Sequence, residues 1–196
     1  MGRPSKATER RAQLIRAFAA QLACTGYEGA TIATVAARAG VAPGMVHHYF
    51  TNKAAMLDAL LDAVEVQISQ RLQQRIISGA GYGQAYLDAA LRLDAHADVQ
   101  LAKCWVGIFA EAQRNPQLLR RLRRLLARQV AWLIKYAQLR EADAVALLTF
   151  IIGALVTGAL TPPTVRGYAA PAAYRLLDAL TAQAEPPNAL RGNRKN

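Results

Sequence analysis

Alanine and leucine make up a third of this chain, and their abundance limits the possible folds more than any other feature of the sequence. There are 41 alanines and 25 leucines among 196 residues. Both residues lose little side-chain freedom in a helix, so both stand near the top of the helix-propensity scale. Apolar residues with helical spacing mark about nine segments along the chain. The sequence therefore predicts an all-α protein of about nine helices.

The chain is strongly basic, with 24 lysines and arginines against 13 aspartates and glutamates, a formal charge of +11. Such an excess predicts a polyanionic partner, either nucleic acid or an anionic membrane surface. Residues 1–53 hold seven basic and two acidic residues, and five arginines lie between Arg120 and Arg128. We expect the arginine run to form a solvated helix face. A second polyanion surface, or pairing with acidic groups of a neighbour, is the alternative.

Several classes of function find no support in the sequence. The two cysteines, Cys24 and Cys104, lie 80 residues apart and lack the spacing of a zinc site. The adjacent His47 and His48 point about 100° apart on a helix, so they do not form a joint metal site. The chain has no nucleophile elbow, phosphate-binding loop, dinucleotide fingerprint or zinc-protease motif. We therefore expect no metal, no cofactor and no enzymatic activity.

Two segments bear on the relation of the chain to membranes. Residues 1–6 are basic and polar and lack the apolar segment of a signal peptide, which predicts a cytoplasmic protein. Residues 144–165 carry no charge, and a single membrane span needs about 20 apolar residues. This segment is rich in alanine, contains threonines and ends at Pro162 and Pro163. A helix buried on all sides, as in a subunit interface, fits it better, and a membrane-associated protein is the less favoured alternative.

Three short segments near the N-terminus, 10–24, 32–39 and 43–50, are predicted helices. Thr8 precedes the first as its cap, and Gly26 ends it. A tight connection joins the second segment to the third. This arrangement predicts a helix-turn-helix, the motif that places its second helix in the major groove of DNA.

The motif covers residues 31–50. Gly40 stands where the chain turns sharply, and glycine adopts a positive φ without strain. In the third segment Val46 and Phe50 share a face that anchors the helix to the core, and the glycine on the opposite face allows a close approach to DNA. The predicted DNA-binding residues are Thr31, Ala33, Thr34, Pro43, Gly44, Met45, His47, His48, Tyr49 and Lys53.

These side chains suit the chemistry of a DNA surface. Met45 offers an apolar contact for a thymine methyl group. His47 and His48 can donate hydrogen bonds to phosphates or to base acceptors. The Tyr49 hydroxyl and the Lys53 ammonium would hold phosphates.

The stretch from Thr31 to Leu57 resembles the DNA-binding signature of TetR-type transcriptional repressors. The matching residues are Thr31-Ile32-x-x-Val35-Ala36-x-x-Ala39-Gly40-Val41-Ala42-x-Gly44-x-Val46-x-His48-Tyr49-Phe50-x-Asn52-Lys53-x-x-x-Leu57. The resemblance implies a homodimer that binds double-stranded operator DNA and is released by an unidentified small-molecule effector. It divides the chain into a DNA-reading head at 1–53 and a helical ligand-binding and dimerisation domain at 54–184. Residues 185–196 are expected to form a disordered basic tail.

Behind the head, the chain resembles the choline-responsive repressors of betaine-synthesis genes. The matching residues are Trp105-Val106-Gly107-Ile108-Phe109-Ala110-Glu111-Ala112, Asn115 and Pro116. Three positions depart from the family pattern. Ala42 replaces the usual serine or threonine and His47 replaces a common tyrosine or serine, and both differences bear on the operator. Ile108 replaces a frequent aromatic residue, and this difference bears on the ligand.

Aromatic and small residues of the second domain are candidates for a ligand pocket and a dimer interface. Aromatic rings would hold a quaternary ammonium ligand by cation–π attraction, although core packing is their commoner use. The predicted pocket residues are Tyr86, Trp105, Phe109, Trp132 and Tyr136. Small residues in the uncharged segment would let two helices pack closely, in a four-helix bundle across a two-fold axis or, alternatively, in the core of one chain. The predicted dimer-interface residues are Ile151, Ala154, Leu155, Gly158, Tyr174 and Leu177.

The sequence thus predicts a ligand-responsive transcriptional repressor that binds an inverted-repeat operator as a homodimer. The alternative is a DNA-binding regulator, or a structural DNA-binding protein, without small-molecule control.

Overall fold

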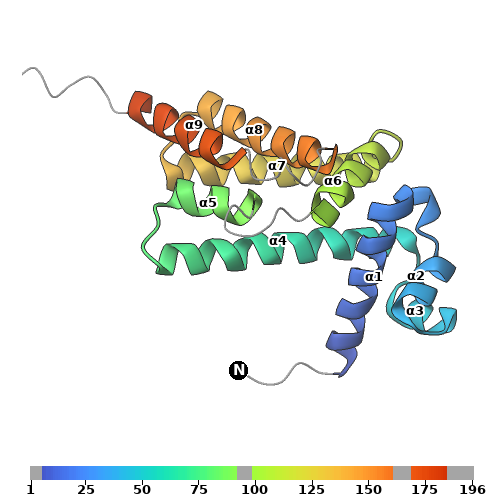
Figure 1. The fold of residues 1–196 in the computed structure, drawn as a ribbon. Helices are drawn as coiled ribbons and strands as arrows, with labels where there is room; N and C mark the ends of the chain where they lie inside the picture. The colour runs from blue at the N-terminus through green and yellow to red at the C-terminus, as the bar shows by residue number, and fades with distance from the viewer. Residues whose placement is uncertain (1–5, 92–98, 161–168, 185–196) are drawn as a thin grey trace, which may run out of the picture.

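The computed structural model describes residues 6–91, 99–160 and 169–184, and within these ranges it consists of nine helices and their connections (Figure 1). In chain order the helices are α1 (Lys6–Gly29), α2 (Ile32–Ala39), α3 (Pro43–Tyr49), α4 (Lys53–Ile77), α5 (Tyr82–Leu91), α6 (Val99–Ala112), α7 (Pro116–Ala137), α8 (Glu141–Leu160) and α9 (Ala169–Ala184). The all-α prediction is confirmed. The predicted basic tail, 185–196, lies outside the described residues.

The first helix differs from its prediction at both ends. α1 is already helical at Lys6, so Thr8 lies inside the helix and is not its cap. Gly26 interrupts α1 with φ 70° and ψ −178°, at the place where the sequence predicts the helix to end. The chain then adds one more helical turn, which ends at Gly29. The connection to α2 is therefore shorter than the sequence indicates.

The start and the buried face of α7 follow directly from its sequence. The Asn115 side-chain oxygen accepts the N–H groups of Gln117 and Leu118, each at 3.1 Å, and so caps the helix. Pro116 occupies the first turn, where its missing N–H costs nothing. Leucines then recur at helical spacing and are buried at Leu118, Leu122, Leu125 and Leu133. The arginines of the run lie outside this leucine face.

The long helix α4 links the two parts of the molecule (Figure 1). α1, α2 and α3 gather at its N-terminal end, and α5, α7, α8 and α9 form a layer along the rest of its length. The helix α6 lies between these groups and packs against both α1 and α8.

The buried side chains form two hydrophobic clusters, and the first crosses the boundary predicted after Lys53. The first cluster contains residues of the helices α1, α2, α3 and α4. It also contains Trp105 and Ile108 of α6 and the first leucines of α7. The second joins the end of α4 with α5, α8, α9 and the second half of α7. The head therefore shares its core with α6 and α7.

The contact between α1 and α6 is especially close. The buried Cys104 thiol donates a hydrogen bond to the Ala19 carbonyl at 3.0 Å. A Cβ atom placed on Gly107 would lie 3.2 Å from the Leu22 Cδ1 atom, so a larger residue there would push the two helices apart. The two helices are therefore in direct contact along this stretch.

The helix α8, which is uncharged from Ala144 onward, contains most of the segment considered for a membrane crossing. None of the helices within the described ranges has the combination of length and hydropathy that a membrane crossing requires.

A buried polar pair ties α5 to α7, and its removal should be costly. The Tyr86 hydroxyl donates to Gln129 Oε1 at 2.6 Å, and the two residues are only 3% and 7% exposed. Burial raises the pKa of Tyr86, so the hydroxyl keeps its proton. Replacing Tyr86 with phenylalanine leaves the buried amide oxygen without its donor. We expect a loss of about 1–3 kcal/mol in the free energy of unfolding, measured by urea denaturation followed by circular dichroism.

The matched control is Tyr136→Phe, which removes the same hydroxyl from a residue of α7 that is 50% exposed. At the same protein concentration this variant should stay within about 0.5 kcal/mol of the parent. Equal effects of the two substitutions would contradict the role given to the buried pair.

Candidate nucleic-acid interface

Two threonines hold the start of α2. The Thr31 hydroxyl accepts the Thr34 N–H at 3.2 Å and so caps the helix. The Thr34 hydroxyl donates to the Gly29 carbonyl at 3.1 Å. Both threonines, and Ala33 between them, remain exposed. These three predicted DNA-binding residues therefore lie at the surface, while the two hydroxyls also stabilise the turn that leads into the motif.

The turn between α2 and α3 depends on Gly40. Its φ of 66° and ψ of 36° place it in the left-handed region, where a residue with a Cβ is strained. The Gly40 N–H donates to the Ala37 carbonyl at 3.1 Å, and the Val41 N–H donates to the Ala36 carbonyl at 3.0 Å. These bonds satisfy the last carbonyls of α2 and redirect the chain.

The start of α3 lacks the usual side-chain cap. Ala42 occupies the cap position, and no side chain bonds to the first N–H groups of the helix. Such a loss costs about 1 kcal/mol, which the fixed φ of Pro43 in the first turn partly offsets. The helix therefore depends on its buried face to stay in place.

The two faces of α3 are clearly divided. Val46 is fully buried, and Phe50 follows the helix as a second buried anchor. Met45 is 42% exposed, and Pro43, Gly44, His47 and His48 are exposed as well. The half-buried Tyr49 meets His48 edge to face, with ring centres 5.0 Å apart. The predicted reading face is thus brought together on one side of the helix.

Gly44 stands at the centre of this face, in open space. A Cβ atom added there would meet no atom of the chain within 4 Å. The internal packing of the protein therefore gives no reason for a glycine at this position.

Contacts with α1 hold the helix-turn-helix motif in place. The Gln13 side-chain amide donates to the Ala39 carbonyl at 2.8 Å, and Arg38 Nε donates to Gln21 Oε1 at 2.9 Å. The Arg11 guanidinium lies 5.0 Å from the centre of the Phe50 ring. Sequence reasoning missed these positioning residues, because an isolated glutamine on a helix gives no periodic signal.

Lys53 has a partner within the chain. Its ammonium donates to the Tyr27 carbonyl at 2.9 Å and lies 4.1 Å from the centre of the Tyr27 ring. Burial raises the pKa of Tyr27, and the carboxylates of Glu111, Glu28 and Asp58 raise it further, so the phenol stays neutral. Lys53 thus joins the start of α4 to the end of α1, and its ammonium has two further protons for a phosphate.

The predicted pocket aromatics are distributed over three helices. Trp105 and Phe109 of α6 stack with ring centres 5.5 Å apart, Trp105 within the first core cluster and Phe109 packed against it. Tyr86 of α5 is buried in the second cluster. On α7, Trp132 is half-buried and Tyr136 is exposed. The pocket formed by these residues stays a prediction.

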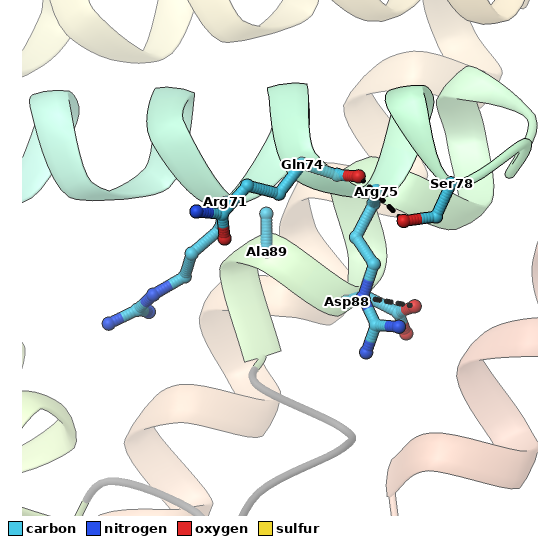
Figure 2. Close-up of a pocket in the computed structure, with 6 residues that line it drawn as sticks. All are labelled: Arg71, Gln74, Arg75, Ser78, Asp88 and Ala89. Carbon is cyan, nitrogen blue, oxygen red and sulfur yellow. Dashed lines mark hydrogen bonds and ion pairs between the residues drawn. The ribbon is translucent and has the colours of Figure 1, made fainter.

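Three cavities are lined by described residues, and the five aromatics line none of these three. The first, of about 260 Å³, lies between α4 and α5 and is polar (Figure 2). The second, of about 360 Å³, separates the start of α4 from the start of α7. The third, of about 310 Å³, lies between α1 and α4 and is mostly apolar.

The predicted dimer residues differ in the surface that they offer. Ile151 and Leu177 are 2% and 5% exposed and pack inside the second cluster, so they have little surface left for a partner. Ala154, Leu155 and Tyr174 are half-buried. Gly158 lies in α8, but its exposure is not among the features that the structure describes.

Comparison with known proteins identifies the family. Residues 14–60, which include the whole motif, match the family described as bacterial regulatory proteins, tetR family. The chain is also 30% identical over 161 residues to the HTH-type transcriptional regulator BetI of Burkholderia cenocepacia, a match that covers 77% of this chain and 82% of that protein. The chain belongs to the tetR family. The BetI of Burkholderia mallei is 31% identical with the same coverage.

Solved structures of transcriptional regulators share the fold. A regulator from Rhodococcus sp. Rha1 superimposes with a TM-score of 0.72 at 23% identity and covers 89% of this chain and 95% of its own. A regulator described as putative from Pseudomonas aeruginosa PAO1 gives a TM-score of 0.69 at 24% identity, covering 90% and 92%. The resemblance inferred from residues 31–57 is confirmed, and the tetR-family chain is a DNA-binding transcriptional regulator. The relatives are named as regulators and not as enzymes.

The two contacts of Lys53 can be separated by salt dependence. Replacing Lys53 with alanine removes both the bond to Tyr27 and any phosphate contact, so binding should weaken on every DNA sequence. Only a lost phosphate contact lowers the slope of log affinity against log salt, by about one unit. We expect that decrease in fluorescence anisotropy titrations over several salt concentrations.

Lys103, which is exposed on α6, supplies the control, because Lys103→Ala removes an equal charge from a helix outside the motif. Its slope should match that of the parent. A Lys53→Ala variant with the parental slope would mean that the lysine serves only the internal contact.

Proposed function

We propose that the protein is a homodimeric repressor that reads an inverted-repeat operator and is released by a small-molecule effector. The observation that carries this proposal is the divided surface of α3. One side is anchored by Val46 and Phe50, and the other presents Met45 and the two histidines as exposed side chains, with open space around Gly44. A helix so exposed suits the major groove, where side chains contact base edges.

The outer side of α8 supports a dimer. Val145 and Leu160 are exposed although apolar, and Thr149 and Gly153 are exposed between them. These residues are spaced by four or seven positions, so they form one uncharged stripe along the helix. In a single chain this stripe faces solvent, and a two-fold partner would cover it. We infer that this stripe, more than Ile151 or Leu177, forms the dimer seam.

The close contact between α6 and α1 supports control by a ligand. An effector held beside Trp105 and Phe109 would act on the helix that touches Ala19 and Leu22 of the head. DNA and effector would then favour different positions of α6, and each would weaken the binding of the other by the same factor. The resemblance of this region to choline-responsive repressors makes a quaternary ammonium compound the first effector to test.

Selection from random DNA tests the reading function. Two heads related by a two-fold axis should enrich an inverted repeat whose half-sites lie about 10 base pairs apart, or a multiple of that. The selected operator then serves to screen quaternary ammonium compounds for release. Recovery of DNA without any shared sequence would reject an operator-specific repressor in favour of a structural DNA-binding protein.

Substitutions at two glycines that have open space around them test dimerisation and DNA reading separately. A Cβ atom on Gly44 or on Gly153 meets nothing within 4 Å, so a larger residue at either place leaves the isolated chain unstrained. Gly153→Leu should shift the sedimentation coefficient towards the monomer, because the stripe on α8 can no longer approach its partner.

Gly44→Leu should leave the dimer intact and weaken operator binding at least 10-fold, which is about 1.4 kcal/mol. An unchanged dimer in the Gly153 variant would place the seam on another surface. Full operator binding by the Gly44 variant would contradict the reading face assigned to α3.

A further inference from the structure

A row of acidic side chains on α4 faces two arginines of α7. Asp58, Asp62 and Glu65 are spaced by four and three residues, so they share one side of α4. Arg121 and Arg128 are seven residues apart and share one side of α7. Together these five residues form what we call the α4–α7 seam.

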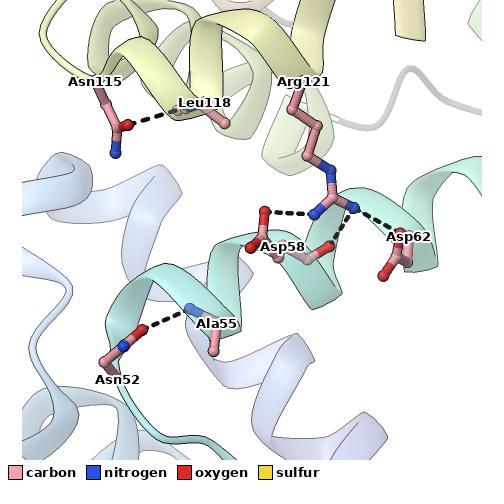
Figure 3. A network of polar contacts seen from close by, with 7 residues as sticks. All are labelled: Asn52, Ala55, Asp58, Asp62, Asn115, Leu118 and Arg121. Atoms are coloured by element: carbon pink, nitrogen blue, oxygen red, sulfur yellow. Dashed lines mark hydrogen bonds and ion pairs between the residues drawn. The ribbon is translucent and has the colours of Figure 1, made fainter. Parts of the chain in front are cut away.

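Arg121 makes the most contacts in the seam (Figure 3). Its Nη1 atom bonds to the Asp58 carboxylate. Its Nη2 atom donates to the Asp58 carbonyl at 3.0 Å and to the Asp62 carboxylate at 2.6 Å. An exposed ion pair contributes little by itself, but a planar guanidinium held by several acceptors fixes both distance and direction.

The second pair repeats the first one heptad later. Arg128 binds the Glu65 carboxylate, and the separation along the chain is 63 residues, as it is between Arg121 and Asp58. A constant separation means that the two helices run in parallel along the seam. A shift of one helix by one turn, about 5.4 Å, would break both pairs at once. The seam therefore defines the axial register of α4 relative to α7.

Apolar packing does not fill this part of the molecule. A cavity of about 360 Å³ lies between the first turns of α4 and the start of α7, with Ala54, Leu57 and Asp58 on one wall and Leu118 and Arg121 on the other. The Arg121–Asp58 pair therefore lies at a gap that side-chain packing leaves open. This gap lies directly after the DNA-binding motif, because Asn52, which accepts the Ala55 N–H at 2.8 Å, caps α4 immediately behind α3 (Figure 3).

The pairing is specific to two members of the arginine run. Arg120, Arg123 and Arg124 are exposed and make no ion pair with any residue that the structure describes. The expected solvated face is therefore correct for these three, whereas Arg121 and Arg128 are engaged. The exposed arginines supply controls of equal charge on the same helix.

We propose that the α4–α7 seam positions the reading head and that Arg121 and Arg128 are positioning residues for operator binding. The proposal rests on the function proposed above. Without the seam the helices stay folded, but α4 and the attached head take a wider range of angles. Fewer molecules then hold both heads at the spacing of the operator, and the apparent Kd rises in proportion.

The first test compares Arg121→Ala/Arg128→Ala with Arg120→Ala/Arg123→Ala in the full chain. Each variant loses two positive charges from α7. Binding to the operator selected from random DNA is measured by fluorescence anisotropy, after circular dichroism has established equal helicity. The seam variant should bind about 10-fold more weakly than the parent, and the control variant should lose less than about threefold.

A second variant separates positioning from net charge. Asp58→Asn/Asp62→Asn removes two negative charges from side chains that are 55% and 67% exposed. Simple electrostatics predicts tighter binding to DNA for this variant, whereas loss of the seam predicts weaker binding. Exchanging the partners, with Asp58→Arg and Arg121→Asp in one chain, should restore most of the affinity that Arg121→Asp alone removes.

The outcomes distinguish the two proposals. If the parent protein enriches no operator, the proposed function fails. If the parent binds its operator but the Asp58→Asn/Asp62→Asn variant binds equally well or more tightly, or the exchanged pair gives no recovery, the seam does not position the head.

Discussion

The burial of Val46 and Phe50 against the N-terminal core is the interaction on which the DNA-reading surface depends. The helix α3 has only seven residues and no side-chain cap, and an isolated helix of that length is unstable in water. Its position comes instead from Val46 and Phe50, which share one core cluster with the fully buried Leu14, Phe18 and Val35. Because the core holds one side of α3 so firmly, the other side is free for contacts with DNA.

The same core joins the head to the rest of the protein. Side chains of α6 and α7 belong to the hydrophobic cluster that contains α1 and α4, so the two functional parts are not independent bodies joined by a linker. Apolar contacts join α6 to α1, and ion pairs join α7 to α4. The two links therefore differ in physical character, one being apolar and the other ionic.

The helices of the head were predictable from sequence because their signals are local. Thr31, Gly40 and Pro43 each have a preferred place at a helix end, and α2 begins and ends where they indicate. The start of α1 was not predictable from Thr8, since a threonine can also lie inside a helix. The inward direction of Ile151 and Leu177 and the pairing of Arg121 depend on which helices become neighbours. A single sequence does not show which helices will be neighbours in the folded chain.

The open space around the outer side of α3 has a consequence for how such a protein changes over time. Met45, His47 and His48 are exposed, and Gly44 has no neighbour within 4 Å of a Cβ position. Substitutions there neither create cavities nor leave buried polar groups without partners, so they change the free energy of folding very little. If this face reads DNA as proposed, a lineage can therefore exchange one DNA target for another by single mutations without a compensating change in its interior. Duplicated copies of such a chain can diverge in their targets while keeping the same scaffold.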